Sequence, residues 1–251
     1  YQPETATTVL TNTNARWRPG ALKGLTVRVD MTESVHYPII DNTDTTITII
    51  GRTWGAHIGD TYSISAYSLS AGSPCIDAGT DAGAPTEDLY ARVRFDDPDT
   101  PNVGGTCDMG CAEYKIWYVN ETAAPGQSGD SWATALNDLQ QALRQSLPGD
   151  NGWVAAGLYY PAQRSAGYVD GSMERDRAFI LPFASNIYGG FNGTENYLSQ
   201  RDIDANIAVL SGDIHTAGNY DSYHVVIGSN NATIDGFRSE ERRVGKECRS
   251  R

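Results

Sequence analysis

The sequence predicts an all-β fold class in which short strands stack as the successive coils of a solenoid beyond Asp150. No helical period continues past that residue, so the helices that join parallel strands in α/β folds are missing. Turn residues end each apolar run or lie close to its end, which favours stacked coils, because each coil can then cover the apolar inner face of the next. The six runs are WVAAGLYY, AFILPF, NIYGGF, IAVLSGDI, YHVVIG and ATIDGF.

Residues 1–67 are predicted to form a small β-rich domain, because they are rich in Thr, Val, Ile and Tyr and poor in helix-forming residues. The clearest unit is a pair of β-prone runs around the turn sequence DNTDTT, within residues 35–51. Trp17, Trp54 and Tyr62 are interpreted as packing residues of the core or its rim, with a sugar-stacking platform as the alternative.

Residues 68–114 are predicted to be irregular and dominated by turns, since they are heavy in Gly, Pro and Asp. They hold three of the four cysteines, Cys75, Cys107 and Cys111. Free thiols or one structural disulfide fit this spacing, whereas a zinc site normally needs four ligands in close pairs.

One helix is predicted at the start of residues 115–237. Its apolar residues fall on one helix face, Asp130 or Ser131 can cap its N-terminus, and Pro148 with Gly149 would end it. Such a helix can cover an open solenoid end, where strand edges are unpaired. The residues on that face are Trp132, Ala135, Leu136, Leu139, Ala142 and Leu143.

Two groups of motifs carry a resemblance to a known family. SPCIDAG followed by CDMGCAEY resembles the pattern that closes right-handed parallel β-helix domains in large secreted bacterial proteins. GDSWATALNDLQQAL, WVAAGLYYP, IYGGFNGTE and VLSGDI resemble the opening of such domains in the pectate-lyase-like superfamily. The resemblance implies that residues 68–114 close one parallel β-helix and that residues 115–237 form the cap and first rungs of another. Cys107 and Cys111 depart from the Val and Ala that the family often shows, and a local disulfide is a conceivable variation.

Residues 238–251 differ in composition from the rest of the chain. They carry six basic and three acidic side chains, although the formal net charge of the whole chain is −12. Their sequence, RSEERRVGKECRSR, resembles the translation of a common short-read sequencing adapter, and we interpret it as an artefact. A basic tail that binds nucleic acid or membrane is the alternative.

The charge and hydropathy of the chain limit its partners. An acidic surface disfavours nucleic acid and anionic lipid. No apolar run approaches the roughly 18 residues that a membrane-spanning helix needs. The charge and hydropathy suit a soluble extracellular protein. The resemblance implies a secreted or cell-surface protein that is monomeric within a longer chain, with a polysaccharide or surface glycan as a candidate partner.

No catalytic, cofactor-binding or metal-binding residue is assigned. The adjacent acidic pairs, Glu87 with Asp88 and Asp96 with Asp97, lie in the irregular segment and are interpreted as solvated charge. The four histidines are isolated in the sequence, and a lone histidine is more often structural than catalytic. No cofactor is expected, although oxygen ligands make calcium conceivable at the acidic residues of the segment. These residues are Asp77, Asp81, Glu87, Asp88, Asp96, Asp97 and Asp99.

Two functions follow as hypotheses. In the first, the chain is a non-catalytic spacer or an adhesive, glycan-binding part of a long surface protein. In the second, it is the N-terminal part of a polysaccharide lyase or glycoside hydrolase whose catalytic rungs are missing. The resemblance to tandem solenoids favours the first.

Overall fold

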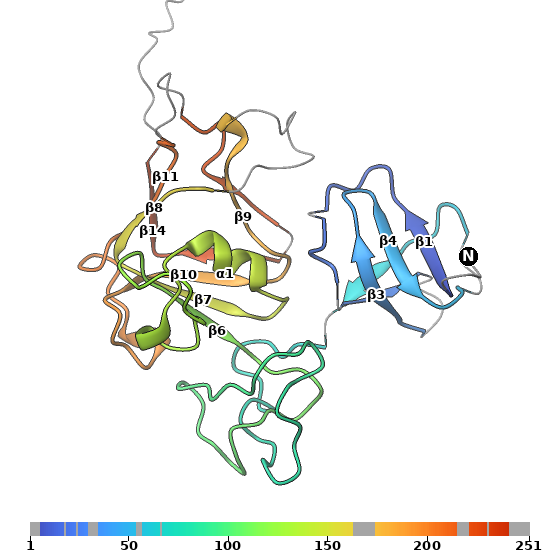
Figure 1. The fold of residues 1–251 in the computed structure, drawn as a ribbon, viewed down its shortest axis with the longest axis horizontal. Coiled ribbons are helices and arrows are strands. Elements are labelled where there is room, and N and C mark those ends of the chain that lie inside the picture. Colours follow the sequence, from blue (N-terminus) through green and yellow to red (C-terminus); the bar gives the residue numbers. More distant parts are fainter. Residues whose placement is uncertain are drawn as a thin grey trace, which may run out of the picture.

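The computed structural model describes residues 6–17, 19–23, 25–29, 35–53, 57–65, 67–162, 174–214, 221–229 and 231–240. Figure 1 shows three parts: an antiparallel sheet near the N-terminus at the right, an irregular segment at the bottom, and a set of short parallel sheets with the helix α1 at the left.

The N-terminal part is a five-stranded sheet in the order β1-β4-β3-β2-β5, and every neighbouring pair is antiparallel. The hairpin predicted within residues 35–51 is present as β3 and β4. Alternate side chains of this hairpin are buried, and the apolar ones form one core cluster with Leu22, Leu25, Val27 and Val29. The strands are β1 (Thr7–Thr11), β2 (Thr26–Arg28), β3 (Tyr37–Asn42), β4 (Thr46–Ile50) and β5 (Ser63–Ser65).

The segment of residues 67–114 is described throughout and contains no helix or strand, as its composition predicts. A single antiparallel bridge joins Glu87 to Val93. Without ladders, the buried backbone amides of this segment must find other acceptors.

The described residues of the C-terminal part form three parallel sheets, in the orders β13-β10-β7-β6, β14-β11-β8 and β12-β9. The strands of the first sheet are β6 (Ile116–Val119), β7 (Asn151–Ala155), β10 (Asn186–Phe191) and β13 (Thr233–Asp235). Those of the second are β8 (Gly157–Tyr159), β11 (Ala208–Ser211) and β14 (Phe237–Glu240), and those of the third are β9 (Phe179–Ile180) and β12 (Val226–Ile227). Three 3₁₀ turns accompany them, η1 (Trp132–Thr134), η2 (Glu174–Asp176) and η3 (Leu198–Gln200).

The prediction of an all-β chain wound as a right-handed parallel β-helix is wrong. The structure is mixed, with about 7% helix and 29% strand, and its strands are divided among several short sheets, some parallel and some antiparallel. Short apolar runs with turn residues at their ends indicate where strands form. They do not fix which strands pair or in which direction, because long-range contacts decide both.

The predicted helix is also shorter than its apolar spacing indicates. The structure divides that stretch into η1 and the helix α1 (Leu139–Gln145), and the N-cap is Asp138 rather than Asp130 or Ser131. Leu136 interrupts the helix because its backbone pairs with the strand β6, donating its N–H to the carbonyl of Tyr118 at 2.8 Å. Pairing with the sheet therefore overrides a residue spacing that by itself fits a helix.

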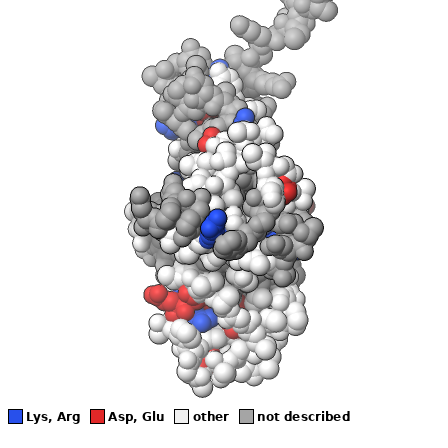
Figure 2. Space-filling view, turned by 90° about the vertical axis from the view of Figure 1, so that its right-hand side faces the viewer, with Lys and Arg blue, Asp and Glu red and all other residues white. Residues whose placement is uncertain are grey.

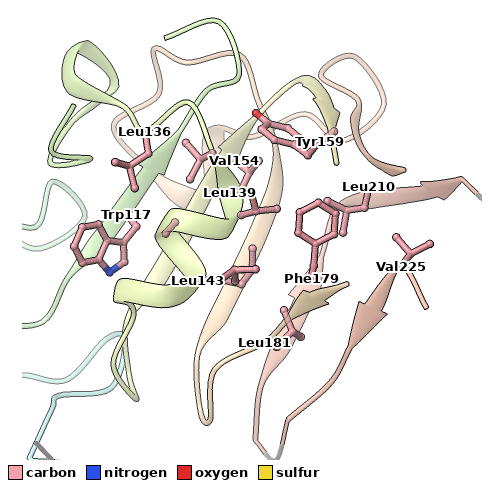
Figure 3. Close-up of a cluster of buried hydrophobic side chains, with 14 residues drawn as sticks. Trp117, Leu136, Leu139, Leu143, Val154, Tyr159, Phe179, Leu181, Leu210 and Val225 are labelled. Carbon is pink, nitrogen blue, oxygen red and sulfur yellow. The ribbon is translucent and has the colours of Figure 1, made fainter. Parts of the chain in front are cut away.

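The main core of the C-terminal part lies between α1 and the parallel sheets. Figure 3 shows Leu139 and Leu143 of α1 facing Val154 of β7 and Phe179 of β9, and all four side chains are almost completely buried. A second cluster is built from aromatic rings on the first parallel sheet, in which Trp153 stacks on Phe191. Among the described residues, no helix has the length and apolar character needed to cross a membrane.

Residues 238–240 of the tail belong to β14 and pair in parallel with residues 209–211 of β11. The remainder of the tail, residues 241–251, lies outside the described residues.

Candidate functional site

Two aromatic side chains form a corner beside the N-terminal sheet. The ring centroids of Trp17 and Tyr62 are 6.1 Å apart and the rings are inclined at 72°. The backbone N–H of Trp17 donates to the carbonyl of Asp44 at 3.0 Å, which ties Trp17 to the β3–β4 turn. The amide of Asn12 donates to the Tyr62 hydroxyl at 2.8 Å, which fixes the second ring. The two rings therefore meet edge to face, a favoured arrangement for aromatic pairs.

Two cavities meet at this aromatic corner. One, of about 410 Å³, lies between the N-terminal sheet and the C-terminal part, and the other, of about 740 Å³, lies against the sheet itself. Trp17 and Tyr62 line both cavities, and Tyr62 is 39% exposed. Trp17 packs against the core cluster of the N-terminal sheet, as the interpretation of a packing residue predicts, and both rings also line the two cavities. Trp54 lies outside the described residues.

The polar groups around the corner can donate and accept hydrogen bonds. Arg16 lines the smaller cavity, and its guanidinium donates to the carbonyls of Thr13 and Ala15. His57 and Asp60 line the larger cavity, where the Asp60 carboxylate accepts the backbone N–H of His57 at 2.6 Å. Figure 2 shows the face that lies at the right of Figure 1, where most of the described residues are uncharged.

The acidic residues of the segment 68–114 serve mainly as acceptors for backbone amides. Asp81 accepts the N–H groups of Thr106 and Cys107 at 3.0 and 3.1 Å. Asp88 accepts those of Tyr90 and Arg92 at 2.8 and 2.9 Å. These carboxylates replace the ladders that the segment lacks.

The structure brings together Asp77 and Asp97, two of the acidic residues that suggested calcium, since the backbone N–H of Asp97 donates to the Asp77 carboxylate. The interpretation of the acidic pairs as solvated charge holds for Glu87 and Asp96, which are exposed, and is wrong for Asp88 and Asp97, which are buried. Asp99 is exposed and accepts the backbone N–H of Leu198 in the C-terminal part. Among the described residues, no group of three or more histidine, cysteine, aspartate or glutamate side chains could hold a metal ion.

A buried ion network around Arg92 joins the irregular segment to the C-terminal part. Its guanidinium contacts the carboxylate of Asp88 at 3.0 Å and that of Asp150 at 2.9 Å, and it donates to the carbonyl of Glu113. The side chains of both aspartates are completely buried.

Burial raises the pKa of Asp150, and Arg92 opposes that shift. Burial also acts to raise the pKa of Asp88, but hydrogen bonds from the backbone of Glu113 and Arg92 lower it below its usual value. Sequence reasoning missed this network, because its members are far apart in the chain.

The histidines do not form a catalytic arrangement in the part of the chain that the structure describes. The Nδ1 atom of His36 lies 3.5 Å from the hydroxyl of Thr26, His57 lies near Asp60, and His224 is exposed. His215 lies outside the described residues.

Cys75, Cys107 and Cys111 are free thiols in the structure. Burial and a hydrogen bond to Asp81 raise the pKa of the Cys107 thiol to about 11. Cys107 is therefore a structural residue with little thiolate at neutral pH.

Comparison with known proteins adds no relative: no family model, no curated protein and no solved structure matches the chain. The resemblance to pectate-lyase-like proteins stays a prediction.

Proposed function

We propose that this chain is a non-catalytic part of a secreted or cell-surface protein and that it binds glycans through the Trp17–Tyr62 corner. The observation that carries the proposal is that this one aromatic pair lines both cavities. Aromatic rings present a large, rigid apolar face, which suits the C–H faces of sugar rings, and neighbouring polar groups can bond the hydroxyls. An adhesive or spacer role in a longer chain is consistent with such a site.

The glycan is proposed to be neutral. The chain carries a formal net charge of −12, so a polyuronate would be repelled over most of the surface. Arg16 is a cation beside the smaller cavity, and its Nη1 atom already donates to the carbonyls of Thr13 and Ala15.

Replacing Trp17 by alanine is expected to weaken glycan binding by about tenfold or more, because the loss of roughly 1.4 kcal/mol of ring contact corresponds to that factor. The measurement is a glycan array of neutral and uronate polymers, followed by calorimetric titration of the best ligand. Tyr62→Ala is expected to have a similar effect. Tyr223→Ala is the matched control, because Tyr223 is 42% exposed and lines neither cavity.

Equal binding by the parent and both corner variants would contradict the assignment of the site. A rise in absorbance from unsaturated product when the protein is incubated with polyuronates would contradict the non-catalytic role and support the alternative, a lyase.

A further inference from the structure

Asp77 is a buried carboxyl group with one oxygen that has no partner. It lies in the left-handed backbone region, with φ of 50°, and is completely buried. Its Oδ2 atom accepts the backbone N–H of Asp97 at 3.1 Å, and its own N–H donates to Oδ1 of Asp108 at 2.8 Å. Its Oδ1 atom is buried and accepts no hydrogen bond. An unpaired buried oxygen is costly, and more so when it is charged.

The charges that act most strongly on Asp77 are all negative. They belong to Asp96, Asp97 and Asp108, of which Asp97 and Asp108 are 4% and 5% exposed. Asp97 bonds the backbone N–H of Asp99 and the hydroxyl of Thr100. Asp108 accepts the N–H of Tyr114.

The nearby cations of the segment are paired with other groups. Arg94 forms an ion pair with Glu113, whose carboxylate also accepts the N–H groups of Phe95 and Asp108. Arg92 is held by Asp88 and Asp150, as described above. Asp81, another carboxylate of the segment, accepts the backbone N–H groups of residues 106 and 107. The negative charge of Asp77 is therefore left without a compensating partner.

We propose that Asp77, Asp97 and Asp108 form a proton-binding site, in which Asp77 takes up a proton and thereby makes the stability of the segment 68–114 depend on pH near neutrality. Protonation removes the charge from the oxygen that lacks a partner and relieves its repulsion with the neighbouring carboxylates. The cluster holds three separate stretches of the irregular segment together, so a proton at this position stabilises all three.

The direction of the pH dependence follows from the folded-state pKa values. Burial, with the charges of Asp96, Asp108 and Asp97, raises the pKa of Asp77 from 3.8 to about 7, and burial raises that of Asp108 to about 6. The folded segment therefore binds protons more tightly than the unfolded chain between pH 4 and 7. Stability rises as the pH falls through this range and is lowest above pH 7.

The test is the pH dependence of thermal unfolding in the full chain and in Asp77→Asn. Asparagine keeps the shape, tolerates the left-handed backbone and carries no charge. The parent is expected to melt at a higher temperature at pH 5 than at pH 8. In the variant this difference is expected to shrink by about 2 °C or more.

Two further variants and a local measurement sharpen the test. Glu87→Gln is the matched control, because it removes one charge from an exposed position of the same segment and is expected to leave the pH difference unchanged. Asp96→Asn is expected to lower the pH at which half of the stability change has occurred, because it weakens the repulsion on Asp77. In amide hydrogen exchange, the protection factors of the Asp77 and Asp97 amides are expected to fall between pH 5 and pH 8 in the parent.

A parent that is equally stable at pH 5 and pH 8, or a variant that loses stability equally at both, would overturn the proposal. Stabilisation of the parent by millimolar calcium at pH 8, abolished in Asp77→Asn, would overturn it in favour of a cation site.

Discussion

Replacing Arg92 by methionine is expected to lower the free energy of unfolding by about 3 to 5 kcal/mol. The side chains of Asp88 and Asp150 are completely buried, and each would lose the cation that offsets its desolvation. The Asp150 carboxylate would keep the indole N–H of Trp117 at 3.1 Å and the backbone N–H of Leu147 at 2.8 Å. These neutral donors do not neutralise its charge. Denaturant unfolding followed by fluorescence measures the change.

The matched control for this substitution is Arg144→Met. Arg144 is 48% exposed and lies 3.8 Å from Asp138, so the same change at that position is expected to cost less than about 1 kcal/mol. The double variant Arg92→Met with Asp150→Asn is expected to recover part of the loss, since it removes one of the stranded charges. A cost for Arg92→Met no larger than that of the control would mean that water reaches the two aspartates and that the network is not a buried one.

Replacing Trp153 by alanine is expected to cost about 3 to 5 kcal/mol. Trp153 is completely buried on β7, stacks on Phe191 with centroids 4.8 Å apart, and meets the edge of Tyr118 at 5.6 Å. The truncation would leave a cavity between the rings of Tyr118 and Phe191. The measurement is again the free energy of unfolding from denaturant titration.

Trp153→Phe serves as the comparison for this second substitution. The indole N–H of Trp153 is buried and has no partner, so phenylalanine removes a buried donor as well as part of the ring. Its cost is therefore expected to be well below that of alanine. Equal costs for the two variants would show that the site fails to relax around a smaller ring and that the indole shape itself is required.

Local sequence patterns located many elements correctly. The hairpin of β3 and β4 follows from two β-prone runs around a turn, and the irregular character of residues 68–114 follows from their Gly, Pro and Asp content. The apolar runs after Asp150 overlap the strands β7 to β13. In each case the signal lies within a few neighbouring residues.

Contacts between distant residues could not be predicted in the same way. Arg92 and Asp150 are separated by 58 positions, and no local sequence pattern indicates that the two residues form an ion pair. The apolar spacing from Trp132 to Leu143 predicts one helix, but Leu136 pairs with β6 and divides it. The Trp17–Tyr62 corner was recognised only as two aromatic residues, because its cavities depend on how the sheet and its loops pack.

The amide-binding carboxylates of the segment 68–114 have a consequence for mutational tolerance. In a sheet the acceptors are carbonyl groups, which every amino acid carries, so most substitutions leave them in place. In this segment the acceptors are side chains, and exchanging a single aspartate deletes the bond outright. Saturation mutagenesis with a folding reporter should therefore find Asp81, Asp88 and Asp108 as intolerant of change as the apolar interior, with even glutamate poorly accepted because of its extra methylene.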